Sequence, residues 1–358
     1  MSNLHETILY VKEKSITKNL EFFKKKLDKK TKVIAVVKAY AYGLGDINIS
    51  KILEFLKVDA FWVADFEEGI SLRKNGIKSI IIVANPGVKS ISEIIKYNLE
   101  VTIYNLRILK KLGNFKKPLN IHLKFNTGMN RFGFSFSDID LIIQTLEEFP
   151  LLNVVSICSH LASSDKENND NFSILQFDNF SKICKKIDAK LDASPYKHIL
   201  NTNGIIRFAD QQYNAVRIGI GLFGIIDNQE IKQVCKLKTI ITQVRNISRN
   251  EFVGYGLKFK ANKNLRIGIV PFGYADGLDR RLGNGVGNLY VNNTFCEIIG
   301  EISMDSCAIN LTNTNAEEGE DVEIFGENIL ITTICRKIET TPYEFISKIN
   351  RRIKRVYI

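Results

Sequence analysis

Short apolar runs alternate with amphipathic stretches over most of the first two thirds of the chain. Eight such runs lie at residues 33–37, 61–64, 79–83, 101–103, 121–125, 154–158, 198–200 and 215–218. Runs of this length and composition are typical of strands buried on both faces. From residue 33 to residue 215, seven intervals cover 182 residues, or about 26 residues per unit, which is the unit size of an eight-fold β/α barrel. The pattern predicts a TIM-type (β/α)8 barrel, with a doubly wound open sheet as the alternative.

The pattern changes after about residue 230. Segments such as "KTIITQVRNI" and "NLYVNNTFCEIIGEISMDSCAINLT" are rich in strand-forming residues, with Gly and Asn at the breaks and one clear helical segment, "TPYEFISKI". We therefore expect two domains: a barrel over residues 10–229 and a mainly antiparallel β domain over residues 230–358. Residues 1–9 are expected to pair with the β domain.

Composition indicates a soluble globular protein. Of the 358 residues, 45% are hydrophobic and 25% are charged. With no apolar run of membrane-spanning length and no signal-like N-terminus, we expect a cytoplasmic protein. The net charge of +11 is spread along the chain, so a nucleic-acid binder is the weakest hypothesis. The six cysteines form no CxxC pair, which favours reduced, buried thiols and makes a metal site unexpected.

Polar residues follow several of the predicted strands, where barrel enzymes carry their working side chains. These residues are Lys38 and Tyr42 after the first run, Lys124 at the fifth, His160 after the sixth, Asn201 and Thr202 after the seventh, and Arg217 in the eighth. The loops after the last two strands commonly bind phosphate in such barrels, and Gly219 allows a close approach of backbone N–H groups. A lysine at a strand end can simply extend to solvent. A lysine, a phosphate site and an arginine together suggest pyridoxal phosphate, whose aldehyde condenses with an amine.

Several motifs in order along the chain resemble those of the alanine racemases, a family of fold-type III pyridoxal phosphate enzymes. They are "VVKAYAYGLG", "HLKFNTGMNRFGF", "SH" at 159–160, "NTNG", "VRIGIGLFG", "VGYGLKF", "PFGYADG", "GEISMDSC" and "PYEF". The resemblance implies that Lys38 carries the cofactor. It implies phosphate contacts from Tyr42, Thr202, Gly219, Ile220 and Tyr343, and places Asn201 beside them. It also places His160 against the pyridine ring and directs Arg217 at the ring nitrogen. An arginine has donors only, so it would keep that nitrogen unprotonated and disfavour transamination.

The resemblance also implies a two-base racemisation of L-alanine and D-alanine, which would supply D-alanine for peptidoglycan. Lys38 would serve one face of the substrate and Tyr255, in "VGYG", the other. Family members are head-to-tail dimers whose tyrosine reaches the partner's cofactor, so a homodimer is expected. By the same resemblance Arg131 would hold the phenolic oxygen of the cofactor or the substrate carboxylate. Met304 and Asp305 would line the substrate side, and Tyr274 would narrow the entrance. Lys124 matches a lysine that is carbamylated in some members.

Four positions depart from the family pattern: Tyr40, Leu44, Asn126 and Glu301. None removes the cofactor lysine or a proposed base, but they leave substrate range open. The alternatives are a racemase of broader specificity, a fold-type III amino acid decarboxylase, and a barrel that binds pyridoxal phosphate without catalysis and serves cofactor homeostasis. The β domain with "VGYGLKF" argues against the last of these.

Overall fold

The computed structural model describes residues 4–191 and 193–358. Two compact units are present. The barrel unit comprises residues 20–41 and 46–221, and the β unit comprises the residues up to 19, 42–45 and 222–358. Each unit is built from separate stretches of the sequence. The predicted bounds, 10–229 and 230–358, instead divide the chain at a single point.

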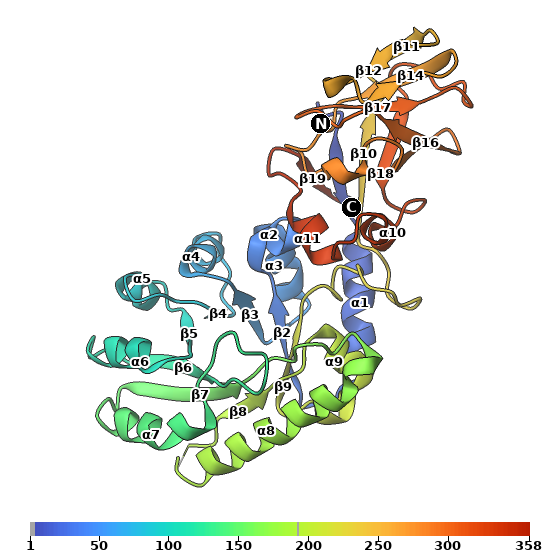
Figure 1. Cartoon of the computed structure of the whole chain (residues 1–358). Helices are drawn as coiled ribbons and strands as arrows, with labels where there is room; N and C mark the ends of the chain where they lie inside the picture. Colours follow the sequence, from blue (N-terminus) through green and yellow to red (C-terminus); the bar gives the residue numbers. More distant parts are fainter. Residues whose placement is uncertain (1–3, 192) are drawn as a thin grey trace. The chain divides into compact units, whose positions relative to one another are not determined.

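Eight parallel strands build the barrel unit, in the order β8-β7-β6-β5-β4-β3-β2-β9 (Figure 1). Their bounds are β2 (Lys32–Val36), β3 (Ala60–Val63), β4 (Ile80–Val83), β5 (Glu100–Ile103), β6 (Leu119–Lys124), β7 (Leu152–Cys158), β8 (Tyr196–His198) and β9 (Ala215–Ile218). Strands β8 and β9 meet through two backbone hydrogen bonds, from Asn214 N to Lys197 O at 3.1 Å and from Arg217 N to Leu200 O at 3.0 Å. The predicted eight-stranded barrel is confirmed.

Amphipathic helices connect the strands and lie outside them (Figure 1). They are α3 (Asp46–Phe55), α4 (Phe66–Lys74), α5 (Ile91–Lys96), α6 (Leu106–Gly113), α7 (Ile139–Glu147), α8 (Asp170–Asp188) and α9 (Thr202–Arg207), with 3-10 turns η1 (Phe136–Asp138), η2 (Glu167–Asn169) and η3 (Ala209–Gln211). Side-chain caps fix some of the helix starts. Asp65 accepts a hydrogen bond from Glu68 N at 3.1 Å, and Asn105 accepts one from Ile108 N at 2.9 Å, so two otherwise unpaired N–H groups are satisfied.

The interior of the barrel is mostly apolar but contains a polar chain. Ile34, Phe61 and Ile81 are fully or almost fully buried, and burial of such side chains is the main stabilising contribution to a core. Polar side chains from five adjacent strands are buried in the same unit: Thr102, His122, Ser156, His198 and Arg217. Buried polar groups usually have partners. Thr102 Oγ1 has none among the described residues, whereas the partners of the other four bear on the site.

The β unit contains a nine-stranded, mainly antiparallel sheet in the order β11-β14-β17-β16-β15-β18-β10-β1-β19. The strands are β1 (Ile8–Val11), β10 (Cys235–Ile240), β11 (Gln243–Ile247), β14 (Leu265–Val270), β15 (Asn288–Val291), β16 (Thr294–Ile299), β17 (Cys307–Asn310), β18 (Asp321–Phe325) and β19 (Lys354–Tyr357). Strand β1 pairs antiparallel with β10 and parallel with β19. The N-terminal strand therefore belongs to this sheet, and the predicted β domain is confirmed.

Smaller elements complete the β unit. A separate ribbon joins β12 (Phe252–Val253) to β13 (Phe259–Lys260), and two 3-10 turns are η4 (Tyr255–Leu257) and η5 (Arg280–Leu282). The helices are α10 (Ile331–Lys337), which the sequence pattern did not predict, and α11 (Pro342–Ser347). Two further elements, α1 (Glu13–Lys25) and α2 (Lys38–Tyr42), have residues in both units.

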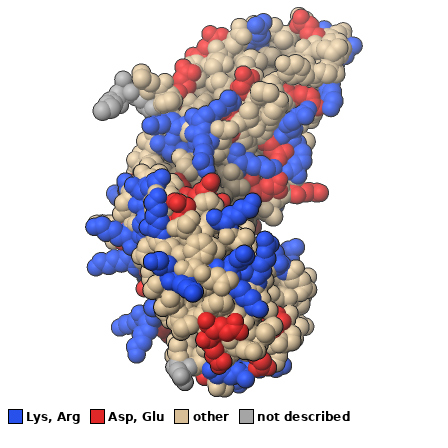
Figure 2. Space-filling model, turned by 90° about the vertical axis from the view of Figure 1, so that its left-hand side faces the viewer, with Lys and Arg blue, Asp and Glu red and all other residues tan. Residues whose placement is uncertain are grey.

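Basic side chains are distributed rather than gathered. On the face shown in Figure 2, lysines and arginines alternate with acidic residues and form no single continuous stripe. Each of the six cysteines is buried and unbridged. Over residues 4–191 and 193–358, no helix combines the length and apolar character needed to cross a bilayer.

Candidate active site

Lys38 lies two residues beyond the last residue of β2, at the carboxyl end of the barrel strands. The strand is extended by a hydrogen bond from Val37 N to Trp62 O at 3.0 Å, so Lys38 is the first residue to leave it. Desolvation by burial, followed by the charges of Arg131 and Arg217, lowers the pKa of Lys38, against the opposing effect of Glu68. A lysine with a lowered pKa is a better nucleophile at neutral pH.

The chain after Lys38 turns in an unusual conformation. Ala39, Tyr40, Ala41 and Tyr42 all have positive φ, between 49° and 57°, and Gly43 follows with φ 85°. This is one turn of left-handed helix, which costs roughly 1–2 kcal/mol for each residue with a Cβ. Such strain persists only where the surroundings impose it, and it is concentrated at functional sites.

Glu68 is one of the groups that stabilise this turn. Its Oε1 accepts a hydrogen bond from Ala39 N at 2.7 Å, and its Oε2 accepts one from Ala64 N at 2.7 Å. The carboxylate of α4 thereby joins the end of β3 to the residue after Lys38. This role could not be predicted from the sequence, because Glu68 occupies an ordinary position in the first turn of a helix.

Glu68→Gln should destabilise the protein by about 2 kcal/mol, because one amide N–H would then face a backbone N–H where a carboxylate oxygen now accepts. The free energy of unfolding in urea measures this. The neighbouring Glu67→Gln, at an exposed position, is the matched control and should change little. Equal stability of the two variants would contradict the role given to Glu68.

Arg217 is buried in the barrel, with 5% of its surface exposed. Its NH1 donates to Nδ1 of His198, and its NH2 donates to the carbonyl of Ser159 at 2.6 Å, to the carbonyl of Ile199 at 3.1 Å and to Nδ1 of His160 at 3.0 Å. Among the described residues these partners are neutral, and no carboxylate contacts the guanidinium. The charge therefore remains available to a ligand in the barrel mouth.

His160 is a neutral imidazole in this arrangement. Desolvation, followed by the charge of Arg217, lowers the pKa of His160 well below its ordinary value. Since Arg217 only donates, Nδ1 of His160 must accept, and its proton resides on Nε2. The sequence predicted His160 and Arg217 as site residues but did not identify His198, which holds the guanidinium from the other side.

Thr202 and the glycines after β9 form a cluster of small groups. Backbone N–H groups of Gly219 and Gly221 point at Oγ1 of Thr202, at 3.3 and 3.4 Å. A Cβ on Gly221 would lie 2.6 Å from Cγ2 of Thr202 and 2.5 Å from the ring of Phe23, so only glycine fits. Two amides and a hydroxyl gathered at one point suit an anion such as phosphate.

Asn201 and Ile220 flank this cluster in different ways. Oδ1 of Asn201 caps α9 by accepting from Gly204 N at 2.9 Å, and it also accepts from Oγ of Ser164 at 2.7 Å. Its side chain therefore fixes the start of the helix that carries Thr202. Ile220 is almost fully buried, so it can offer a ligand only its backbone.

Lys124, Arg131 and His160 line one small cavity at the barrel mouth, together with Phe132 and Ser159. Desolvation, together with the charges of Arg217 and Arg131 and against the opposing effect of Cys158, lowers the pKa of Lys124 to about 8. Phe132 lies 5.6 Å from the ammonium of Lys124, measured to the ring centroid. The barrel unit thus places Lys124 and Arg131 beside the same cavity.

Tyr42 and Tyr343, two of the predicted phosphate neighbours, lie together in the β unit. Their ring centroids are 6.0 Å apart, and Tyr42 also contacts Phe223 at 5.2 Å. Burial, followed by the proximity of Tyr343, raises the pKa of Tyr42. The phenol therefore stays protonated and can donate a hydrogen bond to an anion.

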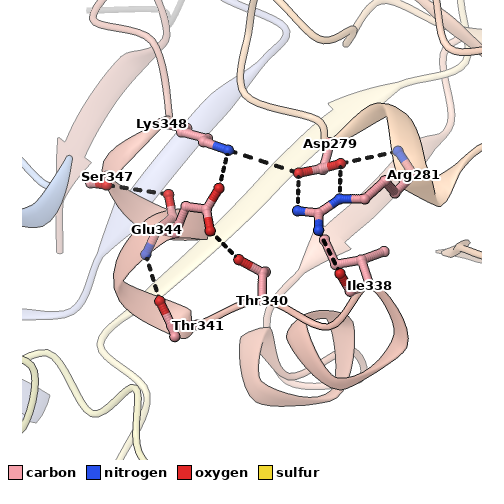
Figure 3. A network of polar contacts seen from close by, with 8 residues as sticks. All are labelled: Asp279, Arg281, Ile338, Thr340, Thr341, Glu344, Ser347 and Lys348. Carbon is pink, nitrogen blue, oxygen red and sulfur yellow. Dashed lines mark hydrogen bonds and ion pairs between the residues drawn. The ribbon is translucent and has the colours of Figure 1, made fainter.

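A network of polar contacts holds α11, the helix that carries Tyr343 (Figure 3). Arg281 forms an ion pair with Asp279 at 2.8 Å. The ammonium of Lys348 lies 3.9 Å from the carboxylate of Asp279 and 2.6 Å from that of Glu344. Arg281 also donates through NH1 to the carbonyl before this helix, at Ile338, at 2.7 Å. The network attaches the helix to the turn η5.

Tyr255, Tyr274 and Met304 line one open hollow of the β unit, with Arg280 and Glu301. Tyr255 is 74% exposed and lies in η4 between Gly254 and Gly256, both with positive φ. This loop presents the phenol to solvent. Asp305, which the sequence placed with this group, is exposed and does not line the hollow.

Close backbone contact positions Tyr274 against Met304. Tyr274 N donates to Ser303 O at 3.0 Å, and Ala275 N donates to Met304 O at 2.8 Å. A Cβ on Gly273 would lie 2.4 Å from Ser303 O, which explains the glycine in "PFGYADG". The two loops therefore form one wall of the hollow.

Some departures from the family pattern have a structural explanation. Glu301 pairs with Lys258 at 2.7 Å and Arg280 at 2.8 Å, so an acidic residue is accommodated by two bases. Oδ1 of Asn126 accepts from two backbone N–H groups of its own loop. Leu44 is fully buried.

A (β/α)8 barrel with a desolvated lysine after its first strand, followed by an antiparallel β domain, defines the fold-type III class of enzyme. Residues 11–227 match the family model "Alanine racemase, N-terminal domain", and residues 234–357 match "Alanine racemase, C-terminal domain". The chain belongs to the alanine racemase family. The predicted amino acid racemase is confirmed by this membership.

Individual relatives agree over the whole chain. "Alanine racemase 1" of Caldanaerobacter subterraneus subsp. tengcongensis is 33% identical over 96% of this chain and 92% of its own length. The alanine racemase of Fusobacterium nucleatum is 34% identical over 93% of this chain and 95% of its own. The solved alanine racemase of Clostridium difficile 630 superposes with a TM-score of 0.93 at 27% identity, covering 100% of this chain and 97% of that one.

One solved structure bears on the cofactor. The alanine racemase of Bartonella henselae, with covalently bound pyridoxal phosphate, has a TM-score of 0.89 and 25% identity, and the match covers 99% of this chain and 100% of that one.

Proposed function

We propose that this chain interconverts L-alanine and D-alanine with pyridoxal phosphate bound to Lys38, using Lys38 and Tyr255 as bases on opposite faces of the substrate. The proposal depends above all on the desolvated Lys38 at the barrel mouth, whose lowered pKa favours the neutral amine. D-alanine is a component of peptidoglycan, so its supply to the cell wall is the proposed role.

The barrel unit fits pyridoxal phosphate in three respects. Lys38 supplies a reactive amine, and Thr202 with the amides of Gly219 and Gly221 supplies a cradle in which a Cβ on Gly221 would clash with Thr202 and Phe23. Arg217 supplies a buried cation without a carboxylate partner among the described residues. We infer that Thr202, Gly219 and Ile220 hold the phosphate, with Asn201 fixing the helix beside it. Tyr42 and Tyr343 are added as phosphate donors on the family resemblance alone.

The residues around the ring have separate tasks. When bound, pyridoxal phosphate withdraws electrons from the α-carbon of an attached amino acid, which eases removal of the α-proton. Arg217 would offer only donors to the ring nitrogen, so this nitrogen would stay unprotonated and the withdrawal would remain weak. We infer that this restraint favours racemisation over transamination. His160, whose lowered pKa keeps it neutral, would lie beside the ring and hold Arg217 through their hydrogen bond.

Inversion needs one proton removed and another delivered on the opposite face. We infer that the amine of Lys38 exchanges the proton on one face and the phenol of Tyr255 on the other. The family's head-to-tail dimers motivate a homodimer in which Tyr255 acts on the partner's cofactor. Arg131, Met304 and Asp305 would contact the substrate, and Tyr274 would limit its size.

Two measurements test this proposal on the purified protein. A visible absorption band of lysine-bound pyridoxal phosphate should appear, and a coupled assay should detect D-alanine formed from L-alanine. The band without racemisation of any amino acid would favour a cofactor-homeostasis protein, and faster turnover of a larger amino acid would favour a broader racemase. Cytoplasmic location, and the absence of nucleic-acid and membrane partners, belong to the same proposal.

Lys124 should be carbamylated to an extent that rises with pH. Its pKa of about 8 means that the neutral amine predominates above that pH. The neutral amine can attack carbon dioxide, forming an N–C bond and releasing one proton. Carbon-13 NMR with labelled bicarbonate should show a carbamate resonance that grows from pH 7 to 9 and is absent in Lys124→Arg. A resonance that persists in this variant would assign the carbamate elsewhere.

A further inference from the structure

Arg217 is one end of a chain of buried polar side chains that crosses the barrel. His198 on β8 accepts from Arg217, and its Nε2 lies 3.4 Å from Oγ of Ser156 on β7. Ser156 Oγ lies 2.7 Å from Nδ1 of His122 on β6, and Nε2 of His122 lies 2.9 Å from Oε2 of Glu100 on β5. The three inner side chains are fully buried. The chain thus joins Arg217 to a carboxylate on the first residue of β5, at the opposite end of the strands.

The two ends fix the direction of the hydrogen bonds between them. A guanidinium can only donate and a carboxylate can only accept. His198 must therefore accept at Nδ1 and carry its proton on Nε2, from which it donates to Ser156. A neutral His122 satisfies both neighbours in one tautomer only, with Nε2–H donating to Glu100 and Nδ1 accepting from Ser156.

Further contacts favour this direction. Asn120 donates to Oε1 of Glu100 at 2.6 Å, and Asn153 donates to Asn120 at 2.9 Å. Although desolvation opposes ionisation, hydrogen bonds from His122 and Asn120 hold the pKa of Glu100 below its ordinary value. Glu100 is therefore an anion at neutral pH and the acceptor for both groups.

Groups around the middle of the chain are compatible with the same direction. The ring of Tyr196 stacks on His198 at 5.7 Å, and its hydroxyl hydrogen bonds with Ser156. Oγ of Ser156 can accept from both Tyr196 and His198 while donating its own proton to His122. Desolvation, followed by the charge of Arg217, lowers the pKa of His198 well below its ordinary value, so His198 is neutral as the scheme requires.

We propose that Glu100 and His122 are positioning residues for Arg217. Through Ser156 they hold His198 in the tautomer that accepts a hydrogen bond from the guanidinium. The consequence for catalysis rests on the proposed function of Arg217 at the cofactor ring. The chain is not a route for protons, because Arg217 at its end stays protonated and cannot pass one on. Reversing the direction would place N–H of His198 against N–H of Arg217 and displace the guanidinium.

Nitrogen-15 NMR of imidazole groups tests the direction in the intact, cofactor-loaded enzyme. The polypeptide has four histidines, and their nitrogen-15 signals are assigned with single His→Gln variants. In the wild-type protein, His122 and His198 should each carry one proton, on Nε2. Finding the proton of His198 on Nδ1, or protons on both nitrogens of His122, in the wild-type enzyme would overturn the proposal.

Two variants then test the coupling. In Glu100→Gln an amide N–H can face Nε2 of His122, and in Ser156→Ala the chain is interrupted. Either change should mix the tautomers of His198 and reduce the kcat of racemisation by about 2- to 30-fold, with a rise in transamination relative to racemisation. Glu100→Asp keeps the carboxylate, so its His198 tautomer and its kcat of racemisation should lie closer to the wild-type values than those of Glu100→Gln. Glu147→Gln, at an exposed site at the end of α7, is the control and should leave both unchanged.

The outcomes separate this proposal from the proposed function. An unchanged His198 tautomer in both Glu100→Gln and Ser156→Ala, or mixed tautomers with unchanged kinetics, would overturn the positioning role. Arg217→Lys tests the function of the arginine by itself. If Arg217→Lys leaves the ratio of transamination to racemisation unchanged, the role of Arg217 at the ring fails, whatever the histidine spectra show.

Discussion

Lys38→Ala should abolish racemisation and the visible absorption band of the bound cofactor, while the protein remains folded. The variant removes the amine that forms the covalent bond and one of the two proposed bases, so no partial mechanism remains. The side chain contributes little to the apolar core, because Lys38 lies beyond the end of β2 and is partly exposed. The left-handed turn after it is held by backbone contacts to Glu68, which alanine leaves in place.

Absorption spectra, a D-alanine assay and circular dichroism together measure this outcome. Lys51→Ala, at an exposed position of α3, is the matched lysine control and should keep band and activity. Turnover near the wild-type rate in Lys38→Ala would reject Lys38 as the cofactor lysine and as a base.

The barrel was predictable because its signal repeats. All eight apolar runs correspond to strands, since a strand buried on both faces needs continuous apolar sequence. The clearest error is at β8, predicted at residues 198–200 and found at Tyr196–His198. Ile199 and Leu200 are buried beyond the strand, so their apolar character extended the pattern past its hydrogen-bonded part.

The left-handed turn after Lys38 could not be predicted from local propensity. Alanine and tyrosine favour negative φ, and the sequence "KAYAY" contains no glycine to signal the turn. Tertiary contacts impose the conformation, among them the hydrogen bond from Ala39 N to Glu68. These contacts join residues distant in sequence, so a reading of neighbouring residues misses them.

Some residues of the candidate site could be predicted from the sequence, and others could not. Lys38, His160 and Arg217 stand out because polar residues at the carboxyl ends of barrel strands are where function is expected. His122 and Glu100 do not stand out, because single polar residues in or beside an apolar run are common. Their role depends on partners across adjacent strands, which only the folded barrel brings together.

Tyr255→Phe should reduce racemisation in both directions by about 10²- to 10⁴-fold, the usual cost of losing one general acid or base. Each direction needs a proton moved on both faces, so neither direction is spared. Cofactor binding and the visible spectrum should be unchanged, because the phenol forms no covalent bond to pyridoxal phosphate. The exposed position of Tyr255 in η4 means that removing one oxygen disturbs no core packing.

Solvent-deuterium incorporation, followed by NMR on Tyr255→Phe, decides between one base and two. Lys38 still exchanges the α-proton on its own face, so the enantiomer that presents its proton to Lys38 should incorporate deuterium at a substantial rate. The other enantiomer needs the missing phenol, and its exchange should be strongly reduced. Tyr290→Phe, in the sheet of the β unit, should exchange both enantiomers as the wild type does. Equal residual exchange of L-alanine and D-alanine in Tyr255→Phe would reject the two-base assignment, while a retained absorption band would leave the assignment of Lys38 to the cofactor intact.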